Sequence, residues 1–454
     1  MANVEAGKWL EQLIAYIESD DAKQLRLLLE SLSPSETAWT VSRLSPEHQS
    51  KLLTLLPVED AACVIEDVGD AQGVDMIGDV APEKAAGILK EMESDGQADL
   101  LGGLSKGDAE AILENMPIAE AKELRQLLQY APDSAGGLMK TEVVSYRDNL
   151  TVGEVCDDLS RRGEEFSDYG IQYVFLVTAY QMLVGVLPLR DLLFSSRDRM
   201  AVDLMIPNPV HVKVNTPLNE LTELFDNYNY LGIPVTDDRG RLIGVVGRSS
   251  VQEAIEKRES RSFLRFAGIV GGEELRSMPA RTRSARRLSW LSINIVLNLI
   301  AASVIAAYEE TLTQVIALAF FLPIISDMSG CSGNQAVAVS MRELTKGLLK
   351  PKEVLYAIAK EFPIGIMNGI VLGILIGVVA AVWQSNIYLG IVVGVALAAN
   401  TLVSVCLGGS IPLIMRALKL DPALVSSPVL TTITDMCGFF FVLSFATAGL
   451  HLIK

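Results

Sequence analysis

Hydrophobic positions recur every twelve residues through the first 130 residues of the chain. Apolar residues stand at Leu32 and at each twelfth position after it as far as Met116, and a turn or capping sequence follows each one. The first of these, Ser33-Pro34, combines a capping hydroxyl with a proline in the first helical turn, which is a common way to begin a helix. Further apolar residues lie three or four apart between the turns. The pattern predicts an all-α superhelical repeat domain of short stacked helices over residues 1–130.

From about residue 131 the pattern changes to short runs of β-forming residues that alternate with helical segments. Two such runs and a helix are followed, about sixty residues later, by a second copy of the same arrangement. The duplication predicts a pair of α+β modules at residues 131–200 and 201–254. The expected strands are Tyr173–Val177, Leu183–Val186, Leu231–Val235 and Leu242–Val246.

The duplicated region resembles a tandem CBS (cystathionine-β-synthase-type) pair, a module known as an adenosine-nucleotide sensor. The resemblance rests on the segment Gly185-Val-Leu-Pro-Leu-Arg-Asp191 and on the hydrophobic strand before it. It implies that Asp191 would bind ribose hydroxyls and Arg190 a phosphate. By the same likeness Tyr173 and Tyr230 would stack on the adenine. The second copy lacks the matching acid, so at most one nucleotide site is expected. The alternative is that Asp191 only caps the helix that follows.

A long polar segment follows the second module and leads into an apolar tail. Residues 255–287 are expected to form a linking, plug-like helix that ends in an arginine cluster. No Asp, Glu, Lys, Arg or His occurs from Pro363 to Met415. Apolar windows near the ~20 residues that cross a bilayer predict an all-α membrane domain of five transmembrane helices over residues 288–454. The spans are expected near residues 288–308, 315–340, 362–382, 388–415 and 426–453.

Basic residues mark one side of this membrane domain. Lysines and arginines cluster before the first span, between the second and third, and between the fourth and fifth. The opposite loops carry only Glu309-Glu310 and neutral residues. The positive-inside rule therefore predicts a multi-pass protein of the cell (inner or plasma) membrane. Its N-terminus is expected in the cytoplasm and its C-terminus outside.

Charge and cysteine content narrow the classes of function. Residues 1–130 hold 25 acidic and 10 basic residues, so they carry −15 of the net charge of −17. This acidic surface excludes nucleic acid as a partner and is compatible with divalent cations. The five cysteines and three histidines are scattered and show no metal-ligand spacing. No residues for hydrolytic chemistry and no P-loop are evident, so we expect a transport protein and not an enzyme.

One carboxylate, Asp435, lies within the last apolar stretch. A charge at mid-bilayer depth costs ~2.5–3.5 kcal/mol on insertion scales, so such a residue usually faces a bundle interior or a water-filled path. Thr431 and Thr432 precede Asp435 and Gly438 follows it by about one turn. A carboxylate among hydroxyls suits a hard cation better than lipid. The pattern indicates cation passage across a membrane.

Polar residues of the second and fourth spans could complete a lining. The second span contains Pro323 and several glycines, which predict a helix broken at membrane depth near Gly333-Asn334. The fourth span offers Asn400 together with threonine and serine. The alternative for most of the glycines is close helix packing. That alternative does not account for Asp435.

The order of acidic repeats, CBS pair, linking helix and five spans resembles the MgtE family of magnesium channels over almost the whole chain. The most specific segments are Gly333-Asn334-Gln335 and the stretch from Asp421 to Gly438. The resemblance implies a homodimer in which two copies of Asp435 surround a largely hydrated Mg²⁺, and Mg²⁺ does keep several waters when bound. Cytoplasmic Mg²⁺ would close the gate, and ATP, if bound, would be a modulator. By the same likeness, the lining would comprise Asp435, Asn400, Asn334, Thr431 and Thr432, and the regulatory candidates are Asp226, Glu253, Glu59 and Asp95.

Some residues depart from the family pattern and leave alternatives open. Cys331 stands where the family usually has Asn, and Asp327 adds a carboxylate, so a transporter selective for Mn²⁺ or Co²⁺ is an alternative. Basic residues such as Lys257 follow the second module and would weaken the Mg²⁺ sensor. A rival class is an intramembrane aspartyl protease with Asp327 and Asp435 as its dyad. A regulatory membrane scaffold without transport is a third reading, but it leaves Asp435 unexplained.

Overall fold

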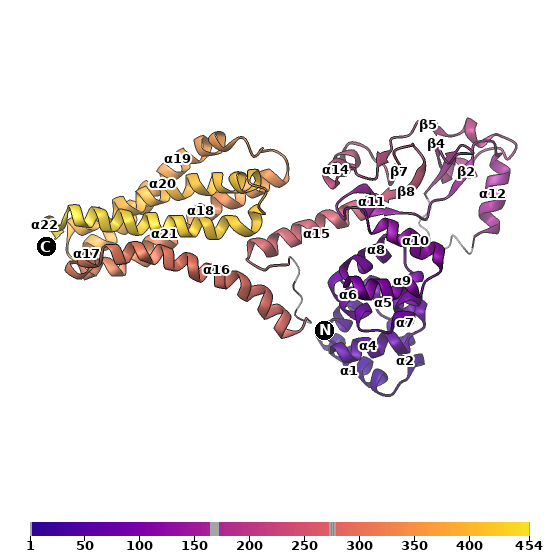
Figure 1. The fold of residues 1–454 in the computed structure, drawn as a ribbon, viewed down its shortest axis with the longest axis horizontal. Helices are drawn as coiled ribbons and strands as arrows, with labels where there is room; N and C mark the ends of the chain where they lie inside the picture. The colour runs from indigo at the N-terminus through magenta and orange to yellow at the C-terminus, as the bar shows by residue number, and fades with distance from the viewer. Residues whose placement is uncertain (1, 164–171, 272–273, 275, 277, 454) are drawn as a thin grey trace. The chain divides into compact units, whose positions relative to one another are not determined.

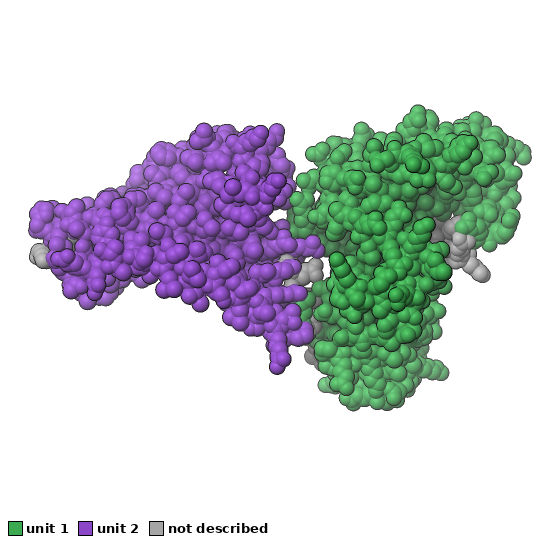
Figure 2. Space-filling model, viewed as in Figure 1, with its two compact units in different colours: residues 1–259, 275–278 green, residues 260–274, 279–454 purple. Residues whose placement is uncertain are grey.

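The computed structural model describes residues 2–163, 172–271, 274, 276 and 278–453, and it divides into two compact units (Figures 1 and 2). The first unit comprises residues 1–259 and 275–278. The second, called the membrane unit below, comprises residues 260–274 and 279–454. The division falls within a single helix, α15 (Arg248–Phe266), which begins before residue 255, where the linking helix was expected.

Short helices fill the N-terminal part of the first unit and confirm the predicted helical repeat. From α3 to α10 each helix begins twelve residues after the one before it, from Pro34 to Ile118. The Ser33 side chain and Glu36 form a capping box at the start of α3, so the local sequence sets the phase of the repeat. The helices are α1 (Ala2–Glu18), α2 (Ala22–Glu30), α3 (Pro34–Val41), α4 (Pro46–Leu55), α5 (Val58–Asp67), α6 (Asp70–Gly78), α7 (Pro82–Lys90), α8 (Ser94–Gly103), α9 (Lys106–Glu114) and α10 (Ile118–Leu127).

The apolar residues at twelve-residue spacing form part of the core of this repeat domain. Leu44, Leu56, Val68, Met92 and Met116 are all buried. Helices two apart in sequence pack together, as α4 does on α6 and α6 on α8. A helix of eight to ten residues cannot bury its apolar face alone, so its stability comes from these neighbours.

Two four-stranded sheets form the CBS pair, and each borrows one strand from across the duplication. In the first sheet the order is β2-β3-β4-β5, and in the second it is β1-β8-β7-β6. Met139 of β1 pairs with Val246 of β8, so the start of the region joins the sheet formed by its end. The strands are β1 (Met139–Lys140), β2 (Ser145–Arg147), β3 (Tyr173–Val177), β4 (Leu183–Pro188), β5 (Ile206–Pro207), β6 (Val212–Lys213), β7 (Gly232–Thr236) and β8 (Leu242–Gly247). The helices among them are α11 (Ala135–Leu138), α12 (Val152–Arg161), α13 (Leu189–Leu193), η1 (Ala201–Asp203) and α14 (Leu218–Asn227).

Long apolar helices make up the membrane unit. Within the described residues, five helical segments are long and apolar enough to span a bilayer, as the sequence predicts. The spans are α16 (Ala280–Ala307), η2 (Ile316–Phe320) with α18 (Leu322–Thr345), α19 (Val354–Trp383), α20 (Ile387–Ala417) and α21 (Pro422–Ala448). Short helices α17 (Glu309–Gln314) and α22 (Leu450–Ile453) complete the unit.

The break predicted near Gly333-Asn334 in the second span is wrong. The helix α18 runs without interruption through Gly330 and Gly333, because backbone groups in a membrane have no water to replace a lost helical hydrogen bond. The glycines serve close packing. A Cβ on Gly333 would lie 2.2 Å from Ser404 Oγ, and one on Gly408 would lie 2.2 Å from Gly333 O. The alternative of close helix packing therefore holds for Gly333.

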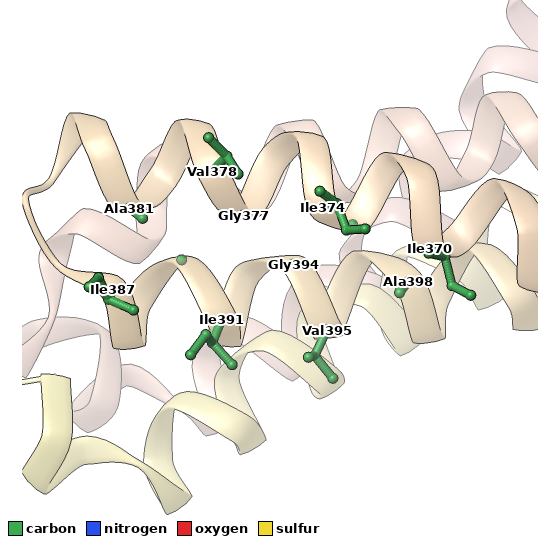
Figure 3. A pocket seen from close by; sticks show the side chains of 12 residues that line it. Ile370, Ile374, Gly377, Val378, Ala381, Ile387, Ile391, Gly394, Val395 and Ala398 are labelled. Atoms are coloured by element: carbon green, nitrogen blue, oxygen red, sulfur yellow. The ribbon is translucent and has the colours of Figure 1, made fainter.

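An apolar groove of about 470 Å³ runs between α19 and α20 (Figure 3). Glycines on both helices face each other there, and a Cβ on Gly390 would lie 2.4 Å from Gly377 O. Ile374, Ile391 and Val395 are among the lining residues, all of which are aliphatic or glycine. A groove without polar groups offers nothing to hold an ion. This groove is therefore not the candidate cation site.

Candidate cation site

Asp435 lies inside the membrane unit and accepts a hydrogen bond from a hydroxyl group. It belongs to α21, is 8% exposed, and accepts at Oδ1 from Ser326 Oγ of α18. No ammonium or guanidinium group is paired with it in the part of the chain that the structure describes. A buried carboxylate without a paired cation is costly, because a hydroxyl replaces only part of its hydration. The site is therefore suited to receive a positive charge.

A chain of polar side chains extends from Ser326 across α18 to α20. Ser329 Oγ lies 2.6 Å from Ile325 O and 3.1 Å from Ser326 O, and it accepts from Asn400 Nδ2 over 2.5 Å. Ser404 Oγ donates to Ser329 O over 2.6 Å. Gly438 lets α21 approach these polar side chains, since a Cβ there would lie 2.6 Å from Asn400 Nδ2. Asp435 and Asn400, two of the predicted lining residues, therefore belong to one polar cluster.

Several buried oxygen atoms of the membrane unit have no hydrogen-bond donor among the described residues. They include Asn400 Oδ1, Asn334 Oδ1 and Thr401 Oγ1. The Thr432 hydroxyl donates to Pro428 O over 2.8 Å, which leaves its oxygen able to accept. Half-buried Thr431 lies next to it on α21. Mg²⁺ binds through one or two carboxylates and several waters, and those waters need acceptors of this kind. Within the described residues no group of three or more His, Cys, Asp or Glu is placed to hold a metal ion.

Asp327 lies in a different environment from Asp435. It is exposed on α18, and the Cys331 Sγ one turn later lies 4.0 Å from its Oδ1. No hydrogen bond joins Asp327 to Asp435 among the described residues. A protease dyad requires two carboxylates close enough to share a proton. The geometry therefore gives no support to the protease alternative.

Two of the four regulatory candidates lie at the junction of α8 and α15. The Asp95 Oδ2 is 3.4 Å from Ser250 Oγ, and Glu253 follows Ser250 by about one turn of α15. Burial raises the pKa of Asp95 to about 6, and Lys140 opposes that shift. The other two are exposed on separate elements, Glu59 in the first turn of α5 and Asp226 in the last turn of α14. The structure thus places Asp95 and Glu253 at one helix junction and the other two candidates on separate elements.

Side chains that the sequence did not single out join the repeat domain to the CBS pair. Lys140 of β1 forms an ion pair with Glu93, just before α8. The Glu142 carboxylate accepts from Ser94 N over 3.0 Å and from Ser94 Oγ over 2.7 Å, so it caps the N-terminus of α8. A lysine and a glutamate two residues apart give no recognisable signal, because their partners are about fifty residues away.

The predicted nucleotide-binding residues lie near one end of the first sheet. Tyr173 Oη is 3.5 Å from Leu231 N, which places it beside Tyr230, and Tyr230 stacks on Tyr228 with ring centroids 5.1 Å apart. The side chains of Arg190 and Asp191 pair with each other over 3.3 Å; Arg190 is exposed and Asp191 is half-buried. Tyr173 of β3 pairs with Pro188 of β4, and Arg190 and Asp191 follow Pro188 in α13. The four predicted residues therefore lie near the same end of the first sheet.

Comparison with known proteins adds an independent observation. The family model for the MgtE intracellular N domain matches residues 32–133, and that for the CBS domain matches residues 135–198 and 201–257. The model described as a divalent cation transporter matches residues 322–445. The magnesium transporter MgtE of Thermus thermophilus is 30% identical over 435 residues, which are 95% of this chain and 96% of that protein. This chain belongs to the MgtE family of magnesium transporters.

Another MgtE relative agrees over almost the whole chain, and two solved soluble parts agree over about half of it. The magnesium transporter MgtE of Bacillus subtilis is 29% identical over 450 residues, 99% of each chain. The cytosolic domain of the Mg²⁺ channel MgtE, solved in complex with ATP, is similar with a TM-score of 0.50 and 30% identity, over 54% of this chain and 99% of that one. The soluble part of a magnesium transporter gives a TM-score of 0.51 at 26% identity, over 56% of this chain and 99% of that one. The resemblance inferred from the sequence is confirmed, and these relatives are named as transporters.

Proposed function

We propose that this MgtE-family chain is a Mg²⁺ channel or transporter whose ion path passes Asp435. The observation that carries the proposal is the buried carboxylate itself, which accepts from the Ser326 hydroxyl and has no protein cation paired with it among the described residues. The free oxygens of Asn400 and Asn334 supply acceptors for the waters of a hydrated ion. Such a site binds a divalent cation strongly enough to admit it and leaves its hydration largely intact.

The proposed assembly is a homodimer in the cell membrane. Each chain supplies one Asp435, and a largely hydrated Mg²⁺ commonly uses one or two carboxylates in proteins. Basic residues flank the spans on the side of the N-terminus, which supports a cytoplasmic N-terminus and an outer C-terminus. The ion moves down its electrochemical gradient.

Cytoplasmic Mg²⁺ is proposed to regulate this path through the repeat domain and the CBS pair. Asp95 and Glu253 lie at the junction of α8 with α15, where a divalent cation would reduce repulsion among carboxylates. Tyr173, Arg190, Asp191 and Tyr230 are proposed to take ATP as a modulator. A relative's cytosolic domain solved in complex with ATP supports that assignment.

Ion uptake into proteoliposomes tests the proposal. We expect uptake of Mg²⁺, with Mn²⁺, Co²⁺ and Ca²⁺ measured alongside to rank the ions. A preference for Mn²⁺ or Co²⁺ over Mg²⁺ would favour the alternative that Asp327 and Cys331 leave open. No divalent uptake by folded protein would remove the transport proposal. Neutralising Asp95 and Glu253 should leave uptake insensitive to Mg²⁺ on the cytoplasmic side.

A further inference from the structure

One ammonium group of α15 is surrounded by carboxylates from three helices. Lys257 Nζ lies 2.6 Å from Asp70 Oδ2, 2.9 Å from Glu253 Oε1 and 3.4 Å from Asp99 Oδ2. Asp70 is the first residue of α6, Asp99 lies in α8, and Glu253 precedes Lys257 by one turn of α15. We call Asp70, Asp99 and Glu253 the α15 triad. All four residues belong to the first unit.

The α15 triad has the charge pattern of a cation site whose cation is part of the chain. Three carboxylates around one centre repel one another unless a positive charge lies between them. Burial acts to lower the pKa of Lys257, but the hydrogen bonds and charges of the triad outweigh burial and raise that pKa above its ordinary value. Lys257 therefore stays charged at every physiological pH.

We propose that Lys257 is a tethered cation that competes with Mg²⁺ for the α15 triad and holds α15 on the repeat domain without metal. An ammonium group is a compact charge with three N–H donors, and the triad offers it three acceptors. A divalent cation would have to displace this group before it could bind two of the carboxylates. The inference rests on the proposed Mg²⁺ regulation, and it identifies an internal competitor that sets how much Mg²⁺ the junction needs.

The same helix also contacts the helix that carries Asp435. Arg265 follows Lys257 by eight residues, about two helical turns, and its Nη1 lies 2.8 Å from Asp421 Oδ2. Asp421 Oδ1 in turn caps α21 by accepting from Ala423 N over 3.0 Å. Lys257 thus lies on the same helix as Arg265, which pairs with the N-cap residue of α21.

The effect of Lys257 is expected to be moderate because the cluster is only partly buried. The side chain of Lys257 is 28% exposed, and those of Asp70 and Asp99 are 39% and 42% exposed. Single exposed ion pairs are weak, but one ammonium that serves three carboxylates forms a network, and its removal leaves like charges together. We therefore expect its loss to shift α15 toward the undocked state about five- to tenfold.

Hydrogen–deuterium exchange of residues 250–259 in the full-length protein tests the proposal. Lys257→Met keeps an apolar stem and removes the charge, and it is compared with wild type in EDTA and across a Mg²⁺ titration. Lys122→Met is the matched control, because Lys122 is an exposed lysine of the repeat domain. Wild type and control are expected to be protected in EDTA. Lys257→Met is expected to exchange about five- to tenfold faster there and to regain protection as Mg²⁺ rises.

Three results would overturn the proposal. In the first, Lys257→Met is as protected in EDTA as wild type. In the second, wild type needs as much Mg²⁺ as the variant to become protected. In the third, adding Asp70→Asn to Lys257→Met restores none of the protection in EDTA, although it relieves part of the repulsion. Exchange in α4 reports on folding of the repeat domain in the same experiment. Because exchange measures docking, a failure of the transport proposal would appear separately, as absent uptake into proteoliposomes.

Discussion

The α15 triad of the first unit is bound by a lysine of the chain itself, whereas Asp435 of the membrane unit is bound by a hydroxyl. Lys257 serves Asp70, Asp99 and Glu253 over 2.6–3.4 Å. Asp435 accepts from Ser326, and no protein cation is paired with it in the described part of the chain. The two sites differ in whether the cation that serves the carboxylate can leave. A tethered ammonium holds helices together and cannot leave, but a carboxylate that lacks one is open to an ion that arrives and departs.

Giving Asp435 a tethered cation of its own would break this comparison most directly. Ser326→Lys places an ammonium next to Asp435, so we expect Mg²⁺ uptake into proteoliposomes to fall at least about a hundredfold, as for a buried charge-assisted pair that excludes other cations. Ser326→Met is the control of similar length without the charge. It adds the bulk of the lysine stem and loses the hydrogen bond to Asp435 but brings no charge, and we expect a loss of about tenfold. Equal uptake by the two variants would contradict the interpretation, and size-exclusion profiles would show whether both are folded.

Close packing around the polar cluster gives the next prediction. Gly333→Ala places a Cβ 2.2 Å from Ser404 Oγ and 2.9 Å from Ser404 O, so we expect the membrane unit to lose about 1–3 kcal/mol of stability. Gly330→Ala is the matched control one turn earlier in α18, since no heavy atom lies within 4 Å of its Cβ. Alanine favours a helix more than glycine does, so Gly330→Ala should be neutral or slightly stabilising. Thermal unfolding in detergent distinguishes the two, and identical midpoints would show that Gly333 does not hold α18 against α20.

The smallest effect concerns Asp95 in the first unit, where burial raises the pKa to about 6. Lys140 lowers this pKa, while Glu93 and Glu142 raise it. Because the folded pKa exceeds the unfolded value, the contribution of Asp95 to stability is complete below about pH 4 and is lost as the pH rises through about 6. Asp95→Asn should therefore be more stable than wild type at pH 8, by about 1–2 kcal/mol.

Thermal unfolding in EDTA at pH 8 and pH 5 measures this difference, with Asp79→Asn as an exposed control. The advantage of Asp95→Asn should shrink at pH 5, where wild type carries a proton. A pH-independent difference would mean that Asp95 does not titrate between these values.

The sequence predicts the local features of the fold well. The twelve-residue spacing anticipates the helix starts from Pro34 to Ile118, because capping residues and apolar phase are encoded within each short repeat. The five apolar helices follow from length and composition alone. Strand exchange between the two sheets was not foreseen, since nothing near Met139 indicates that it pairs with Val246.

The candidate site was predictable in part. Asp435 is conspicuous because it is a charge in an apolar run, but Ser326 is one serine among several in α18 and only the folded chain identifies it as the partner. The break predicted at Gly333 failed because the same glycine composition serves close helix packing. Lys257 looked like a departure that weakens a sensor. Its position between three carboxylates arises from helices brought together by folding, which no local pattern encodes.

The most direct test of the central claim compares Mg²⁺ uptake by Asp435→Asn and Asp327→Asn in proteoliposomes. Both variants remove one carboxylate from the membrane unit, but Asp435 is buried beside Ser326 and Asp327 is exposed on α18. We expect Asp435→Asn to abolish uptake and Asp327→Asn to retain most of it. Uptake by folded Asp435→Asn at the wild-type rate would contradict the claim that the ion path depends on this carboxylate.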